Sequence, residues 1–235
     1  MSQQISSEEP ERMGIFDIWF EALTQPREET FTRIAAQPNA TTGNALVWVF
    51  VATLITGMVA AVVQTFSVRS MFSDPFFSEY MPEGFGGAIS IGTLACSVPI
   101  GAVLGVLSFA ITVGIIQWVA KLFGGIGSFE KLAFVMAAIS VPVSLISALF
   151  SLLSLIPYVN ILAGLIAFAF FIYVLVLEVT AVKAVNYFGW GQAIGSVFLP
   201  VAALFLIACC CIAALSAMLG PVINDMFNTI NQGLY

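Results

Sequence analysis

Five long, almost uncharged apolar blocks fill most of this chain between residues 44 and 219. A helix needs about 20 consecutive apolar residues to cross the hydrocarbon core of a bilayer. Each of the five blocks reaches that length, so the sequence predicts five transmembrane helices. The predicted spans cover residues 44–66, 89–119, 132–156, 160–182 and 192–219, and the last should end at the Gly220-Pro221 pair.

The composition places the chain among membrane proteins. Of its 235 residues, 60% are hydrophobic and only 9% are charged, whereas soluble domains average about 25% charged residues. The net charge of −6 argues against nucleic-acid binding, which needs a basic surface. Histidine is absent, which excludes Ser-His triads and His-based metal or haem sites. We predict an all-α polytopic membrane protein that is not an enzyme and has no cofactor, since no nucleophile–base pair or buried carboxylate dyad can be assembled.

The basic residues orient the predicted spans. Six of the seven Lys and Arg residues fall on the side of the N-terminus, and Arg69 falls on the other side. The positive-inside rule therefore predicts a cytoplasmic N-terminus and an outer C-terminus. We expect a disordered acidic tail over residues 1–14, a cytoplasmic amphipathic arm over 15–43, the membrane domain over 44–219 and an outer interfacial amphipathic tail over 220–235. Because the tail has no apolar stretch, the first span should act as an uncleaved signal anchor.

The arm has the pattern of two short amphipathic helices. In IFDIWFEAL the apolar residues share one predicted face, formed by Ile15, Phe16, Trp19, Phe20 and Leu23. A second helix should begin at Pro26 and end before Pro38, with Glu29 and Arg33 paired one turn apart. Interfacial lipid-binding helices usually carry Lys or Arg, whereas residues 15–23 carry only acids. We therefore expect the arm to pack against this protein's own inner loops or against another protein, rather than on anionic lipid.

Glu178 is the one acid inside a predicted span. Carboxylates within a bilayer are costly and often mark functional sites. Glu178 also lies about one turn before Lys183, where it could reach interfacial water or pair with Lys121, Lys131 or Lys183. The sequence leaves open a structural interfacial role, a proton or substrate role, and an intersubunit contact.

Prolines and glycines suggest how the spans pack. Pro99, Pro142 and Pro200 should each kink a helix, which favours packing but also occurs in transporters. Gly101 and Gly105 form a G-x-x-x-G pair, which allows close helix approach within one chain or between two chains.

Two further segments attract attention. The loop between the first two spans combines acids with aromatic residues, including Phe76 and Phe77, which favours interface anchoring over a partner surface. The run from Cys209 to Cys211 cannot converge on one metal, because consecutive helical residues point about 100° apart. A contact between this run and Cys96 stays open, and ordinary packing is the better interpretation.

Several linking segments carry a family likeness. The chain contains, in order, PREETFTRIAAQPN, LFGGIGSF, Pro142, the Ile156-Pro157 turn and KAVNYFGWGQA. Over about residues 15–219 this arrangement is similar to the Yip family, membrane proteins named for interacting with Ypt/Rab GTPases, and in particular to its bacterial members. The resemblance implies a non-enzymatic five-helix fold in the bacterial inner membrane. Eukaryotic relatives act in vesicle traffic and membrane shaping, but their cytosolic Asp-Leu-Tyr-Gly-Pro and Gly-Tyr motifs are missing here, so no GTPase-binding residues are implied.

The sequence therefore predicts a non-enzymatic multi-pass membrane scaffold, adaptor or accessory subunit. Its expected partners are the lipid bilayer and either other membrane proteins or a second copy of itself. The candidate interaction or packing residues are Trp19, Phe20, Phe76, Phe77, Gly101, Gly105 and Glu178. The alternatives are a small transporter or channel that uses the kinked spans and Glu178, and a membrane-shaping protein that acts through its amphipathic segments.

Overall fold

Helices are the only regular elements in the part of the chain that the computed structural model describes, residues 13–72, 91–153, 155–156 and 160–233. They are α1 (Ile15–Thr24), α2 (Glu28–Ala35), α3 (Thr42–Phe72), α5 (Ile91–Leu122), α6 (Phe129–Leu153), α7 (Asn160–Asn186) and α8 (Trp190–Gly233). The last five are long and apolar enough to cross a membrane. The predicted all-α fold with five spans is thus confirmed.

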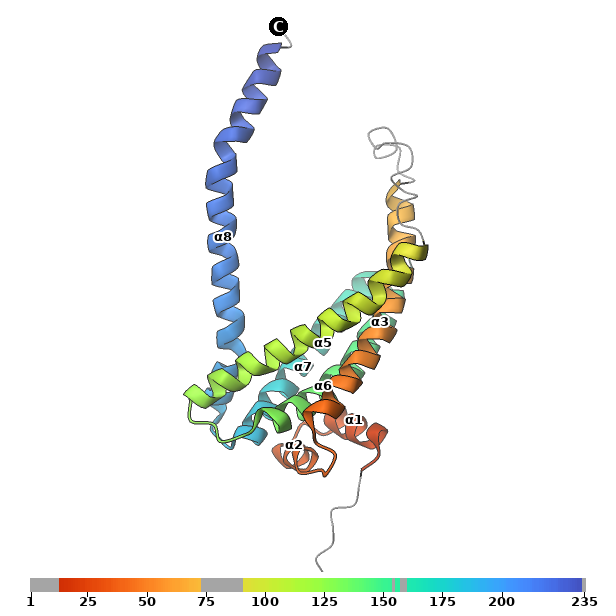
Figure 1. Ribbon diagram of the computed structural model, residues 1–235, viewed down its shortest axis with the longest axis vertical. Coiled ribbons are helices and arrows are strands. Elements are labelled where there is room, and N and C mark those ends of the chain that lie inside the picture. The colour runs from red at the N-terminus through yellow and green to blue at the C-terminus, as the bar shows by residue number, and fades with distance from the viewer. Residues whose placement is uncertain (1–12, 73–90, 154, 157–159, 234–235) are drawn as a thin grey trace, which may run out of the picture.

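Helices α1 and α2 and the C-terminal end of α8 lie at opposite ends of the molecule. Figure 1 shows α1 and α2 at the base of the bundle and the last turns of α8 at the far end. The loops that follow α5 and α7 lie at the same end as α1 and α2. We call this end the N-terminal face. The arrangement is that expected of an odd number of spans, while the assignment of this face to the cytoplasm stays a prediction.

Helix α6 forms the centre of the packed half of the bundle. It contacts α3, α5 and α7 as well as α1 and α2. Every residue from Leu132 to Ile139 is buried. A helix enclosed by neighbours must be apolar all round, and small residues allow those neighbours to approach closely. Small residues allow this close approach in the part of α6 nearest to the N-terminal face, at Ala133, Ala137 and Ala138.

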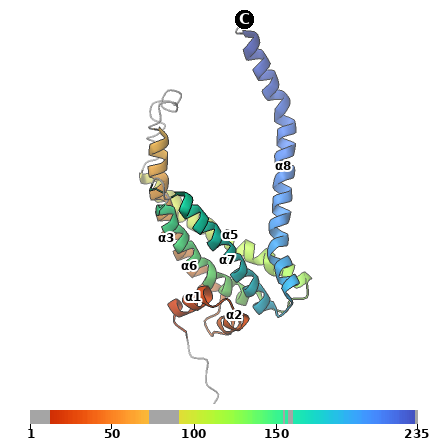
Figure 2. The same ribbon diagram turned by 180° about the vertical axis from the view of Figure 1, so that it is seen from behind.

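Helix α8 packs on the bundle only near its start. Ala193, Ser196 and Val197 are buried there, whereas every residue from 201 to 220 is exposed. Figure 2 shows the rest of α8 standing apart from the other helices. The expected helix end at Gly220-Pro221 is wrong, because α8 continues to Gly233. Proline removes a single helical hydrogen bond, and membrane helices tolerate that loss.

Candidate functional site

The arm is held on the N-terminal face by apolar contacts. Helix α1 buries Ile18 and Ala22, and α2 buries Phe31 and Ile34. These side chains belong to the same core as α6 and α7, so the arm packs on the membrane helices themselves. The hydroxyl of Tyr173 in α7 also donates a hydrogen bond to the carbonyl of Leu23. The arm therefore packs against its own protein as expected, but on the membrane helices rather than on the inner loops.

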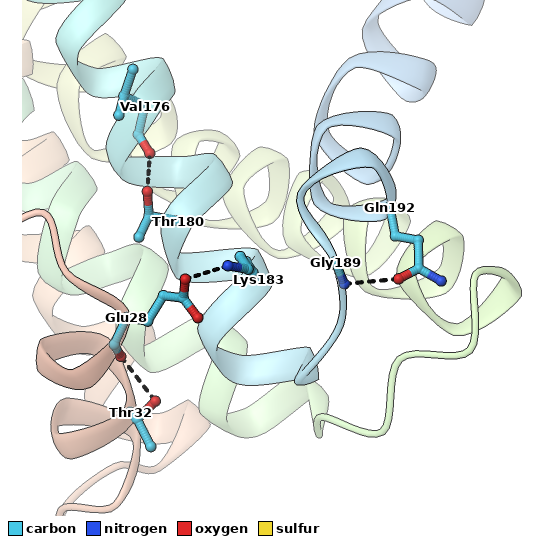
Figure 3. Close-up of polar contacts among 7 residues, drawn as sticks. All are labelled: Glu28, Thr32, Val176, Thr180, Lys183, Gly189 and Gln192. Atoms are coloured by element: carbon cyan, nitrogen blue, oxygen red, sulfur yellow. Dashed lines mark hydrogen bonds and ion pairs between the residues drawn. The ribbon is translucent and has the colours of Figure 1, made fainter.

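Charged contacts add to this attachment. Lys183 of α7 forms an ion pair with Glu28 of α2 (Figure 3). Its ammonium also lies 4.3 Å from the centre of the Trp190 ring at the start of α8. Arg33 pairs with Glu21 of α1 at 2.6 Å. The predicted Glu29–Arg33 pair is therefore wrong, because Arg33 is taken by a tertiary partner on the neighbouring helix.

Replacing Lys183 with methionine is expected to loosen α2. The change removes a partly exposed ion pair and a cation–π contact, which together contribute about 1 kcal/mol. Amide hydrogen exchange over α2 should then rise about fivefold, since 1 kcal/mol changes an equilibrium by that factor. Lys121→Met is the matched control, because Lys121 is exposed at the end of α5. Equal exchange in the two variants would contradict the role of Lys183.

An aromatic chain links the arm to the bundle. Trp19 contacts Trp48 of α3 with ring centres 5.8 Å apart, and Trp48 contacts Phe134 of α6 at 4.9 Å. Phe16 and Phe20 point away from this chain's core and are 79% and 69% exposed. Of the predicted apolar face, Trp19 and Leu23 therefore pack against the core, while Ile15, Phe16 and Phe20 are exposed. The fully buried residues of α1, Ile18 and Ala22, were not part of that prediction.

A buried polar junction joins α5, the loop after it and the end of α7. Gln117 Nε2 donates to Asn186 Oδ1 at 3.0 Å and to the carbonyl of Gly127 at 2.7 Å. Asn186 Nδ2 donates to Gln117 Oε1 at 3.3 Å and to the carbonyl of Val182 at 3.1 Å. The backbone carbonyl of Asn186 accepts from Ile126 N at 3.3 Å. Both amide side chains are buried, so the junction satisfies polar groups that would otherwise be costly.

The start of α8 is tied to the same loop. Gln192 Nε2 donates to the carbonyl of Phe123 at 3.0 Å, and its Oε1 accepts from Gly189 N at 2.9 Å. Figure 3 shows the second of these contacts beside Lys183. Gly127 lies so close to α7 that an added Cβ would fall 2.5 Å from the carbonyl oxygen of Val185. Hydrogen bonds therefore join the loop after α5 to the start of α8. Close backbone approach at Gly127 joins the same loop to the end of α7.

A cavity of about 700 Å³ lies between α3, α5, α6 and α7. Its polar lining includes Thr53, Thr56, Gln64, Ser97, Ser140, Ser144, Ser147, Ser151 and Glu178. Glu178 thus faces a cavity, and in the described part of the chain it forms no hydrogen bond or ion pair. Of the lysines considered as its partners, Lys183 is engaged by Glu28 instead.

The two glycines of the G-x-x-x-G pair in α5, Gly101 and Gly105, have different surroundings. A Cβ on Gly105 would fall 2.9 Å from Cγ2 of Thr53, so this glycine permits close contact of α5 with α3 in the same chain. Gly101 has open space around its Cα and lines the cavity. The alternatives of internal packing and dimerisation are therefore decided for Gly105 in favour of internal packing.

The comparison with protein families agrees with this arrangement. The Yip1 domain matches residues 20–212, which is most of the chain. The chain belongs to the Yip1 domain family. The match begins within α1 and ends in α8, so it includes residues 20–43 of the arm, the polar junction and the cavity. Neither the curated proteins nor the solved structures yield a match.

Two segments that suggested the Yip1 domain meet at the polar junction. Gly127 belongs to LFGGIGSF, and Asn186 and Gln192 belong to KAVNYFGWGQA. Sequence reasoning did not predict the Gln117–Asn186 pair. The sequence did contain a signal for this pair. Gln117 and Asn186 are amide residues in two apolar helices, and each lies near the helix end at the N-terminal face. Buried amides in such positions usually find partners across helices.

The remaining residues that the sequence singled out lie in varied surroundings. Phe76 and Phe77 lie outside the described residues. The thiols of Cys96 and Cys209–Cys211 are free and exposed, so the expected packing of the triplet is wrong. Among the residues that the structure describes, no group of three His, Cys, Asp or Glu residues could hold a metal ion. Pro99 and Pro142 lie inside continuous helices.

Proposed function

We propose that this Yip1-domain protein is a non-enzymatic scaffold, adaptor or accessory subunit of a larger assembly in the bacterial inner membrane. Its N-terminal face would lie in the cytoplasm, where most of the basic residues predict it to be. The family relationship supports a multi-span membrane protein without catalytic activity. A partner protein would dock on the exposed side of α1.

The observation that carries this proposal is a pair of exposed aromatic side chains on an anchored helix. Phe16 and Phe20 lie one helical turn apart and are largely exposed, although α1 is held by Ile18, Ala22 and Trp19. A fixed helix loses little conformational freedom when a partner binds, and aromatic residues are common anchors of interfaces. Acidic Asp17 and Glu21 flank the pair, which disfavours anionic lipid as the contact.

The test is a double Phe16→Ser and Phe20→Ser variant. Blue-native electrophoresis of gently solubilised membranes should show the unaltered chain in an assembly larger than a monomer. Loss of two interface anchors should reduce the assembled fraction at least about tenfold. Stability of the isolated chain should change little, because both side chains are exposed.

The matched control is Leu122→Ser with Ile126→Ser. These apolar side chains are 65% and 73% exposed at the same face but belong to α5 and the loop after it. The control should leave the assembly intact. The proposal fails if the unaltered chain migrates as a monomer in every mild detergent, or if the Phe16 and Phe20 variant assembles as before.

Two other roles are kept as alternatives. A transporter or channel is favoured by the cavity beside Glu178. Membrane shaping would use the exposed aromatic side of α1 as a wedge in the interface. In that case the Phe16 and Phe20 double variant would lose liposome tubulation while the purified chain shows no partner.

A further inference from the structure

We propose that the cavity between α3, α5, α6 and α7 binds an ammonium-bearing organic ligand, with Glu178 as its counter-ion. This site does not depend on the partner surface of α1. Its volume of about 700 Å³ lies in the range of organic ligand pockets, about 300–1,000 Å³, and far exceeds that of a bare ion.

Helices α3 and α6 contribute most of the polar lining of the cavity. Helix α3 contributes Thr53, Thr56 and Gln64, and α6 contributes a serine stripe that begins at Ser140 and ends at Ser151. Eleven helical residues rise about 16 Å, so the α6 stripe covers half the thickness of a hydrocarbon core.

The hydroxyl groups of the wall are arranged to accept hydrogen bonds from a ligand. Ser144 Oγ donates to the carbonyl of Val141 at 2.8 Å, and Thr53 Oγ1 donates to that of Val49 at 2.8 Å. Each hydroxyl has one proton, so donation to the helix backbone leaves its oxygen with lone pairs only. Glu178 adds a carboxyl group to the same wall. A ligand that donates hydrogen bonds fits this lining best.

The carboxyl group also favours a cation. Among the residues that the structure describes, the lining of the cavity contains no Lys or Arg, and the one lysine close in sequence to Glu178, Lys183, is bound by Glu28 and Trp190. A low-dielectric region disfavours the ionised form of a carboxyl group, and a cation bound beside Glu178 would stabilise that form. A bound ammonium group would supply this positive charge and would donate up to three hydrogen bonds to the wall.

The packing of the bundle determines where the ligand enters. Towards the N-terminal face the cavity adjoins the buried segment of α6 that ends at Ile139 and the buried residues Val179, Ala181 and Val182 of α7. Ser140, Ser144 and Glu178 are half-buried, while Gln64 and Ser147 nearer the opposite face are exposed. The ligand should therefore enter from the face opposite α1 and α2.

An adjoining cavity suits an apolar substituent on the ligand. It has a volume of about 380 Å³ and shares Val143, Ser147, Ser151 and Val174 with the larger one. Its remaining lining is mainly apolar and includes Phe150, Phe170 and Phe171. The ligand is thus an amphiphilic amine, which could be a soluble alkylammonium or the headgroup and chain of an aminolipid.

The test measures charge-selective access to the cavity. Cys96 and Cys209–Cys211 are replaced with alanine, Ser144→Cys is introduced, and the chain is reconstituted in phosphatidylcholine vesicles. A cationic methanethiosulfonate should label this cysteine at least about tenfold faster than an anionic one. Adding Glu178→Gln should abolish the difference. Ser147→Cys serves as a second reporter, and Val103→Cys, on an exposed part of α5 outside the cavity, should stay unlabelled.

Two protection arms identify the source of the ammonium group. Octylammonium should slow labelling in phosphatidylcholine vesicles if the ligand is a soluble amine, and phosphatidylethanolamine in the vesicles should slow it if the ligand is a lipid. Octylammonium should also raise the thermal stability of the unaltered chain and not that of Glu178→Gln. Equal labelling by cationic and anionic reagents, a preference that survives Glu178→Gln, or no protection in either arm would overturn the proposal.

Discussion

Replacing Gly127 with alanine is expected to lower the stability of the membrane domain by about 3 kcal/mol. The new Cβ would fall 2.5 Å from the carbonyl oxygen of Val185 and 2.9 Å from Oδ1 of Asn186. Both atoms belong to the end of α7, so relief of the clash must displace a helix end. Overpacking of this kind costs about 1–3 kcal/mol, and disruption of the hydrogen bonds of Gln117 and Asn186 adds about 1 kcal/mol.

The measurement is thermal unfolding of the purified chain in detergent, followed by tryptophan fluorescence. A loss of about 3 kcal/mol should lower the midpoint by roughly 6–12 °C for a chain of this size. Gly164→Ala is the control, because Gly164 lies in α7 with nothing within 4 Å of an added Cβ. That change should be neutral or stabilising by up to about 1 kcal/mol. Equal midpoints for the two variants would show that the close approach at Gly127 is unimportant.

Replacing Phe31 with alanine is expected to release α2 from the membrane helices. Phe31 is completely buried in the core that α2 shares with α6 and α7. Truncating a buried phenylalanine costs about 3–5 kcal/mol, which exceeds what the surface ion pairs of the arm can contribute. The arm is a short segment at the edge of the bundle, so we expect local opening rather than loss of the five spans.

Hydrogen–deuterium exchange and limited proteolysis would detect this opening. Amides of residues 28–35 should exchange at least about a hundredfold faster, and trypsin should cleave after Arg27 and Arg33. The matched control is Phe16→Ala, since Phe16 has the same side chain but is largely exposed. It should change stability by less than about 0.5 kcal/mol. Unchanged exchange in Phe31→Ala would mean that other contacts hold the arm.

The five spans could be predicted because the bilayer imposes a length on any apolar helix that crosses it. The candidate site could be predicted only in part. A helical projection of residues 15–23 groups Phe16 and Phe20 with Trp19, yet α1 packs through Ile18 and Ala22. Pattern analysis selects the most apolar face, whereas packing selects the face whose shape fits the neighbouring helix. The same limit applies to Arg33, whose partner Glu21 lies on another helix.

The sequence by itself determined the number of membrane helices, the presence of an amphipathic arm and the likeness to Yip1-domain proteins. These follow from composition, length and local order along the chain. The tertiary structure decided that Gln117 meets Asn186, that Lys183 holds Glu28, and that Glu178 faces a cavity rather than a lysine. Each of these contacts joins residues far apart in the sequence, and only the packing of the helices brings such residues within hydrogen-bonding or van der Waals distance.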